Sequence, residues 1–413
     1  MIDYPKQLNK IFDKLNKYNA KAILVGGFVR DKLLNIDSKD IDIEVYGISS
    51  FSKLADILKE FGDVNSVGKS FGVCKLRFEN YDLDFSLPRV DSKMSSGHRG
   101  FDVKVDPNLN FKTAASRRDF TINAIGYDVK ERKLLDPFNG LEDLKSRTLR
   151  AVDKNTFIED PLRVLRAAQF YARFELMIED NLNTLCKEMV KGGMLYELPK
   201  ERIFQEIKKL LLKSKRPSLG FELLKEFGSN IYTKNIHVVD EMTSQLTSNT
   251  NTNMVLMLAA LCYDFDSNLA EEFILKLTDE KEVLKRVLPL IIKHDKIDKI
   301  FSDGLDNYSL YKLASKVKIQ ELLILARAIH YTKSSSRIYE AGDAVKTKAE
   351  ELHVLKEKLP SILKGEDILD CGLEPSPKFS EILHIAYEAQ MKSEFNSHDM
   401  AIKWLEKYLL SHS

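Results

Sequence analysis

The sequence predicts an α+β head followed by a long all-α body. Over the first ~130 residues, short segments alternate apolar and polar or acidic residues, which is typical of half-buried strands. From about Asp153 to the end, apolar residues recur instead at the 3.6-residue spacing of helices. The change of period near this point therefore divides the chain into a mixed N-terminal part and a helical remainder.

Each expected element follows from its local pattern. In the head, strands are expected at Ala22–Gly26, Asp40–Tyr46, Val73–Phe78 and Tyr81–Phe85, helices at Val29–Leu34 and Phe51–Phe61, and a polar, Ser- and Gly-containing loop at Pro88–Gly100. Farther along, the clearest helices are Asp160–Phe174, Glu201–Leu212, Met254–Tyr263 and Glu282–Lys293.

Composition limits the class of protein without naming it. The chain has 413 residues, enough for two to four domains, and its 63 basic and 62 acidic residues leave a net charge of +1. Bulk charge therefore gives no sign of a nucleic-acid partner, although segregated charges can still bind one. Four widely spaced cysteines indicate reduced thiols, and no apolar run is long enough to span a membrane. We expect a cytoplasmic protein that needs neither a membrane nor a protein partner.

The most informative segment is the strand Asp40–Tyr46, with the sequence DIDIEVY. On a strand, Asp40, Asp42 and Glu44 share one face, while the intervening apolar residues point to the core. Asp82 and Asp84 repeat this pattern on another expected strand. If the two strands are neighbours, three carboxylates converge and can hold a pair of Mg²⁺ ions for displacement at phosphorus. A solvated acidic edge strand is the alternative, and an isolated Asp-x-Asp is more often that.

The segment Leu24–Asp31 favours the metal-binding interpretation over the acidic edge strand. A strand runs into Gly26 and Gly27 and then into a helix, which lets backbone N–H groups approach a phosphate closely. Arg30 adds a guanidinium suited to a triphosphate. A tight strand-to-helix turn is the alternative for the glycines alone, but the order strand, Gly-Gly, helix, carboxylate strand is more specific than either half.

These residues resemble the class II tRNA nucleotidyltransferase and bacterial poly(A) polymerase family. GGFVRD followed by KDIDIEVYG is similar to the signature of that family. Four further segments resemble its later motifs in the same order, and one more resembles the tail of CCA-adding enzymes: Arg117–Ala124, Leu135–Leu144, Glu159–Arg166, Leu198–Glu206 and Gly365–Leu383. The set as a whole is specific, although single members are not.

The resemblance implies a small, mainly antiparallel sheet in the head and four domains: head 1–130, nucleobase-reading neck 131–215, helical body 216–350 and tRNA-binding tail 351–413. It implies template-free addition of CCA, or part of it, to tRNA from CTP and ATP with Mg²⁺. Carried over by motif, the residues divide by role: Asp40 and Asp42 bind metal, Asp84 is the third carboxylate, Gly26, Gly27, Arg30 and Arg118 hold the triphosphate, and Asp160, Arg163 and Arg166 face the base.

Several residues allow a second, structural interpretation. Asp160 precedes Pro161 at a helix start, where it would cap the helix. It also lies three residues before Arg163 on the same helix face, so that the carboxylate acceptor and the guanidinium donors could together pair with cytosine or adenine. Asn123 fits backbone support and ribose contact equally. Arg173 is expected on a solvated helix face, and Gln169 stands where some relatives carry arginine.

Three other functions compete with CCA addition. A poly(A) polymerase would use the same site, and a non-catalytic RNA-binding protein would have lost a metal carboxylate. A His-Asp metal phosphohydrolase is disfavoured, because Tyr263 stands in the histidine place before Asp264, and His237 and His294 are expected to be ordinary core or surface residues.

Overall fold

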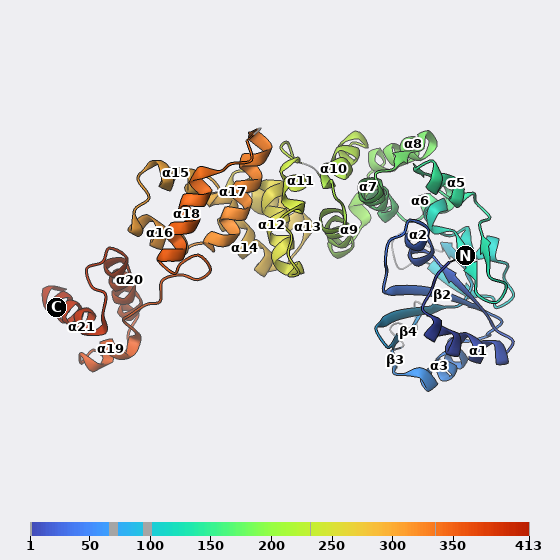
Figure 1. Cartoon of the computed structure of the whole chain (residues 1–413), viewed down its shortest axis with the longest axis horizontal. Helices are drawn as coiled ribbons and strands as arrows, with labels where there is room; N and C mark the ends of the chain where they lie inside the picture. Colours follow the sequence, from blue (N-terminus) through green and yellow to red (C-terminus); the bar gives the residue numbers. More distant parts are fainter. Residues whose placement is uncertain (1, 66–72, 94–100, 232, 335, 413) are drawn as a thin grey trace. The chain divides into compact units, whose positions relative to one another are not determined.

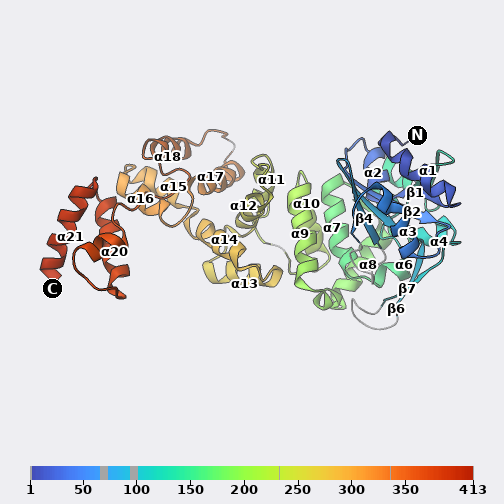
Figure 2. The ribbon, with the colours of Figure 1, turned by 90° about the horizontal axis from the view of Figure 1, so that it is seen from below.

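The computed structural model describes residues 2–65, 73–93, 101–231, 233–334 and 336–412. These residues form two compact units, 1–232 and 233–413. The first contains the sheet, and the second is helical (Figures 1 and 2). The prediction of an α+β head followed by an all-α remainder is confirmed, while the four-domain division stays a prediction.

The head is built on one seven-stranded sheet with the order β3-β4-β5-β2-β1-β8-β9. All neighbours pair antiparallel except β2 and β5, which are parallel. Its strands are β3 (Val64–Asn65), β4 (Val73–Phe78), β5 (Tyr81–Ser86), β2 (Asp40–Tyr46), β1 (Lys21–Val25), β8 (Gly126–Asp128) and β9 (Lys133–Leu135). The expected strands therefore all form, and the sheet is mainly antiparallel as predicted.

The two faces of this sheet are used differently. Ile41, Ile43 and Val45 join the main core, which also contains apolar residues of α1 (Asn9–Lys17) and α3 (Phe51–Leu58). Figures 1 and 2 show these two helices together beside the sheet. Because side chains alternate along a strand, the acidic residues of β2 point to the other face. The alternating acidic and apolar residues of β2 thus place the apolar side chains in the core and Asp40 and Asp42 on the face of the candidate site.

The prediction of a loop at Pro88–Gly100 is partly wrong. Residues Arg89–Lys93 form strand β6, which pairs antiparallel with β7 (Phe101–Val105) in a separate two-stranded sheet. The alternating residues of Phe101–Val105 supply a partner for this edge, so pairing outweighs the polar composition of the segment. Residues 94–100 of the expected loop lie outside the described residues.

Helices complete the first unit and make up the second. In the first unit they are α2 (Gly27–Leu33), α4 (Phe111–Ala115), α5 (Gly140–Lys145), α6 (Lys154–Ile158), α7 (Leu162–Phe174), α8 (Asp180–Lys191), α9 (Lys200–Lys213) and α10 (Pro217–Glu226). In the second they are α11 (Val238–Thr243), α12 (Thr250–Cys262), α13 (Ser267–Leu277), α14 (Lys281–Lys293), α15 (Lys296–Ser302), α16 (Asn307–Ala314), α17 (Ile319–Lys333), α18 (Glu340–Glu351), α19 (Gly365–Asp370), α20 (Lys378–Met391) and α21 (His398–His412).

Helices α7, α9 and α10 pack together as one bundle beside the head. Gly220 permits the close contact, because a Cβ atom there would lie 2.8 Å from the main-chain oxygen of Ala168 on α7. This packing sets the polar side of α7 and the basic side of α9 around a common space. Among the described residues, no helix has the length and apolar character needed to cross a membrane.

Candidate active site

The parallel pairing of β2 and β5 brings the predicted carboxylates together. In the register of this pair, Asp40 lies opposite Asp82 and Asp42 lies opposite Asp84. The four residues therefore share one face on adjacent strands. From the sequence, this convergence could be predicted only if the two strands were neighbours, because nothing in the sequence of either strand specifies its partner strand.

Asp42 is an exposed residue with charged groups of both signs around it. Its pKa is raised, chiefly by loss of contact with water and then by the Asp84 and Asp40 carboxylates, while Arg118 acts in the opposite direction. Asp84 is partly neutralised by Lys75, whose Nζ lies 3.2 Å from its Oδ2. Among the described residues, no three His, Cys, Asp or Glu side chains are already gathered to hold a metal ion. The donor set nevertheless fits a divalent cation, because carboxylates that repel one another are stabilised by shared positive charge.

Gly26 forms the floor next to these carboxylates. Its φ of +67° lies in the region that favours glycine. A Cβ atom here would lie 3.0 Å from Nη1 of Arg118 and 3.2 Å from Oδ2 of Asp42. The glycine therefore keeps open a small space between a guanidinium and a carboxylate, and α2 begins at the next residue, Gly27. This is a suitable cradle for a phosphate accompanied by a cation.

A cavity of about 720 Å³ opens above the cradle. Its walls come from the start of α2, the strand β2, the segment before β8, and helices α7 and α9. All predicted site residues except Asp84 line it: Gly26, Gly27, Arg30, Asp40, Asp42, Arg118, Asn123, Asp160, Arg163 and Arg166. The structure thus gathers into one space residues that span more than 130 positions of the sequence.

A buried network of arginines and carboxylates supports the cavity wall. Arg30, 3% exposed, donates to Asp31 at 2.8 Å and to Oδ1 of Asn123 at 2.5 Å, and its guanidinium stacks on Phe170 and Phe174. The Nδ2 of Asn123 donates in turn to Asp119 at 2.9 Å. Asn123 is therefore a link between two charged side chains, and neither of its predicted roles, backbone support or ribose contact, is decided by these bonds.

Asp119 is the centre of this network. Its Oδ2 accepts hydrogen bonds from Nε of Arg166 at 2.7 Å and lies 2.5 Å from Nη2 of the same residue. Although burial alone would raise it, Arg166 and the Asn123 amide hold the pKa of the Asp119 carboxyl below its usual value. The Nη1 of Arg166 also lies 3.9 Å from Glu206. The Arg166 side chain is thus fixed by carboxylates and does not belong to a solvated helix face.

The expected base-reading pair lies at the start of α7. Asp160 accepts the N–H of Leu162 at 3.2 Å, which is the predicted capping contact, and also pairs with Arg202 at 3.1 Å. Arg163 donates to two main-chain oxygens, those of Thr156 at 2.8 Å and Arg117 at 2.6 Å. Both side chains line the cavity, but their present partners are protein groups, and they do not bond to each other through their side chains.

Three features of the site were not anticipated. Arg173 is not on a solvated face, because it pairs with Asp31 at 3.3 Å and lines the cavity. Glu44 is fully buried, accepting from Tyr46 at 2.6 Å and from Arg117 at 3.3 Å. Gln169, 2% exposed, also lines the cavity, and its Nε2 has no hydrogen-bond partner among the described residues. Asp31 lies 142 residues from Arg173, and Arg117 lies 73 residues from Glu44, so the sequence carried no signal for these two pairs.

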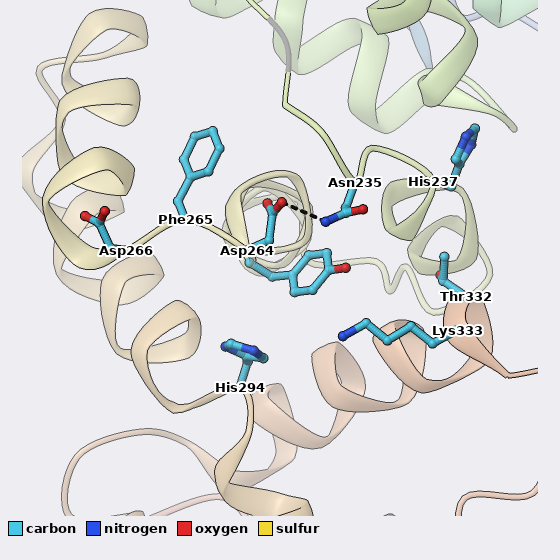
Figure 3. Close-up of a pocket in the computed structure, with 9 residues that line it drawn as sticks. Asn235, His237, Asp264, Phe265, Asp266, His294, Thr332 and Lys333 are labelled. Atoms are coloured by element: carbon cyan, nitrogen blue, oxygen red, sulfur yellow. Dashed lines mark hydrogen bonds between the residues drawn. The ribbon is translucent and has the colours of Figure 1, made fainter.

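The second unit contains its own cavity, of about 490 Å³ (Figure 3). His237, Tyr263, Asp264 and His294 all line this space. Asn235 donates to Asp264 at 2.7 Å, and the amine of Lys333 extends toward the side where His294 lies (Figure 3). The absence of a three-ligand metal group noted above holds for this cavity too, over the described residues.

Two family models match the first unit. Residues 22–150 match the poly A polymerase head domain, and residues 175–229 match a model described as a probable RNA and SrmB-binding site of polymerase A. The first match contains the cradle and the carboxylate strands, and the second contains α9 and α10. The sheet and its site thus lie in a segment similar to a poly A polymerase head, and the helices that follow are similar to a segment described as RNA-binding in polymerase A.

Curated relatives extend the comparison. The chain is 41% identical over 209 residues to a multifunctional CCA protein of Aliivibrio salmonicida (strain LFI1238), a match covering 50% of this chain and 49% of that one. A multifunctional CCA protein of Methylobacillus flagellatus is 39% identical over 206 residues. The chain thus matches about half the length of these relatives.

Solved structures share the whole fold. A Bacillus stearothermophilus CCA-adding enzyme in complex with CTP matches with a TM-score of 0.75 and 19% identity, over 99% of both chains. A Thermotoga maritima CCA-adding enzyme complexed with tRNA matches with a TM-score of 0.65 and 21% identity, over 99% of this chain and 97% of that one. At 19% and 21% identity, these structures share the fold of this chain.

Proposed function

We propose that this protein adds CCA, or part of it, to the 3′ end of tRNA from CTP and ATP without a template. The observation that carries the proposal is the register of Asp42 with Asp84, next to the cradle formed by Gly26 and Arg118. Nucleotidyl transfer requires a held triphosphate beside carboxylates that can bind divalent cations. The relatives named as CCA proteins favour tRNA as the acceptor.

The metal-binding residues would be Asp40 and Asp42, with Asp84 close enough on the neighbouring strand to share the charge. Mg²⁺ bound there would neutralise phosphate charge and make the terminal hydroxyl of the RNA more acidic. Lys75 holds Asp84 in place on the open side of this group.

The protein's own groups have separate tasks. Gly26 would let the triphosphate approach the backbone, and the Arg118 guanidinium lies beside this glycine. We assign Arg30 and Asn123 a positioning role, because Asn123 connects the Arg30 guanidinium to Asp119. Arg166 is held by the same carboxylate. These bonds fix the donors before substrate arrives, which reduces the reorganisation that binding requires.

Base selection is assigned to Asp160 and Arg163. A carboxylate acceptor and a guanidinium donor can complement cytosine or adenine, whereas uracil and guanine would leave buried polar groups unpaired. For this, Arg163 must exchange at least one of its main-chain partners for the base. A tRNA substrate agrees with the cytoplasmic location expected from the sequence.

The test is nucleotide incorporation into three tRNAs, ending before CCA, after C and after CC, with labelled CTP or ATP and Mg²⁺. Label from both nucleotides, stopping at the completed CCA, is expected. Asp42→Ala should abolish incorporation, and retained activity in this variant would contradict the metal assignment. Lys133→Ala, a change on the distant edge strand β9, is the matched control and should leave incorporation unchanged.

The same assay separates the alternatives. The poly A polymerase name of the matching head model favours poly(A) synthesis as the second candidate. Long A tails on unrelated RNA would identify that activity, and label from CTP alone or ATP alone would identify a partial CCA activity. RNA binding without any incorporation would leave the non-catalytic interpretation.

A further inference from the structure

Lys75 places a positive charge next to the carboxylates of the proposed metal site. It belongs to β4, the strand beside β5 in the sheet, and its Nζ lies 3.2 Å from Oδ2 of Asp84. In the strand registers, Asp42 lies opposite Asp84, and Asp84 lies opposite Lys75. The sheet thus carries a row of two carboxylates and one ammonium group. Asp84 therefore has a negative neighbour on one strand and a positive neighbour on the other.

This row faces a cavity of about 540 Å³, which Asp40, Asp42, Asp84 and Lys75 all line. The side chain of Lys75 is 54% exposed and that of Asp84 is 36% exposed, so water and small ions reach the pair. An ion pair this open to water is weak, because each charge is solvated when its partner leaves. Asp84 can therefore exchange the ammonium group of Lys75 for another cation.

The contact between Lys75 and Asp84 also has a purely structural interpretation. Opposite charges on neighbouring strands contribute modestly to the stability of a sheet. That interpretation explains the contact but not its position, because the anion that Lys75 neutralises is one of the carboxylates that meet at the proposed metal site. A cation held between Asp42 and Asp84 would be repelled by the nearby charge of Lys75.

We propose that Lys75 is a competing counter-ion that weakens the binding of a divalent cation to the carboxylates of β2 and β5. Lys75 supplies Asp84 with positive charge that a bound cation would otherwise supply. The protein alone therefore binds the cation weakly, and the negative charge of a triphosphate in the Gly26 cradle is needed for tight binding. Lys75 acts through Asp84 and is a positioning residue. This inference rests on the proposed function and adds a control on its metal site.

Arg77 provides a matched comparison that separates the contact with Asp84 from the general field of the cavity. It lies on the same strand as Lys75 and lines the same cavity. In the strand register, however, it lies opposite Asp82, which is not among the proposed metal-binding residues. Removing the charge of Arg77 therefore changes the potential of the cavity without releasing Asp84.

Titration of the protein with Mn²⁺, followed by the electron paramagnetic resonance signal of the free ion, tests the proposal without nucleotide or RNA. An exposed ion pair shifts an equilibrium by up to about fivefold, and the double charge of Mn²⁺ increases the effect. Lys75→Met should therefore tighten Mn²⁺ binding by about five- to tenfold, and Lys75→Gln, which removes the same charge, should do likewise. Lys75→Arg keeps the charge and should bind Mn²⁺ within about twofold of the wild type, and Arg77→Met should tighten binding by at most about twofold.

The possible outcomes separate this inference from the proposed function. Thermal melting checks that each variant is folded. Unchanged or weaker Mn²⁺ binding by the folded Lys75→Met and Lys75→Gln variants would overturn the proposal, because Lys75 would then only hold Asp84 in place. An equal gain in Arg77→Met would overturn it as well, since the effect would belong to the whole cavity. Asp42→Ala should remove the Mn²⁺ site, and wild-type binding by this variant would instead refute the metal assignment on which the proposed function depends.

Discussion

Replacing Asp119 by asparagine tests the buried charge network behind the cavity. The change keeps the shape of the side chain but removes the charge that faces Arg166. Asp119 is 7% exposed and receives two charge-assisted contacts from that guanidinium, at 2.7 and 2.5 Å. Removing one partner of a buried ion pair costs about 3–5 kcal/mol, because the other charge is left uncompensated. Glu206, 3.9 Å from Arg166, retains part of the compensation, so we expect about 3 kcal/mol.

The measurement must report on the first unit alone. Trp404 is the single tryptophan and belongs to the second unit, so its fluorescence in urea serves as the internal control. Hydrogen exchange of α7 peptides reports the first unit and should show the loss. In a double-mutant cycle with Arg166→Met, the double variant should be less destabilised than the sum of the single changes. A loss below about 1 kcal/mol, or strict additivity of the two variants, would refute the assigned coupling.

The same carboxyl predicts a pH dependence. Its pKa is lower in the folded protein than the ordinary value of 3.8. The stabilisation is therefore complete above that ordinary value and is lost as the pH falls toward the lowered pKa. The Asp119→Asn variant should show a correspondingly weaker loss of stability in acid, measured by the same hydrogen-exchange protection of α7.

Three further predictions concern packing, an unpaired amide and a helix cap. Gly220→Ala should destabilise the first unit by about 1–3 kcal/mol in urea unfolding, because the new Cβ atom would crowd the main-chain oxygen of Ala168; a neutral result would contradict the packing distance. Gln169→Met should raise its stability by about 1 kcal/mol, since the buried Nε2 has no partner among the described residues; equal or lower thermal stability would show that the amide is satisfied. Asp306→Ala should cost the second unit about 1 kcal/mol by removing the cap on the Ser309 N–H. The pKa of Asp306 is lowered chiefly by hydrogen bonds from Ser309, so this difference should shrink as the pH falls through that pKa, followed by Trp404 fluorescence.

Local patterns predicted the elements of the head well. The strand Asp40–Tyr46 has the predicted bounds, because alternating acidic and apolar residues suit a sheet with one buried face. The same alternation failed at Glu44, which shares the face of Asp42 but is buried and paired with Arg117. Strand periodicity identifies a face but cannot indicate where a later segment, here that of Arg117, will cover it.

Residues whose role depends on distant partners were the least predictable. Arg173 has a solvent-facing pattern along α7, yet it pairs with Asp31 of α2. Arg89–Lys93 was expected to be loop, because its composition is polar and its partner strand begins beyond a Gly-containing segment. In both cases the deciding contact is made by the tertiary fold, which outweighs local preference.

The single parallel pair in the sheet has a kinetic consequence. Asp42 and Asp84 become neighbours only when β2 and β5 associate, and the chain between them must first traverse α3, β3 and β4. Contacts between segments so far apart in sequence close a large loop, and their entropic cost delays them relative to hairpins such as β4 with β5. The paired carboxylates of β2 and β5 should therefore be among the last parts of the head to assemble, so that a partly folded chain holds Asp42 and Asp84 on separate strands.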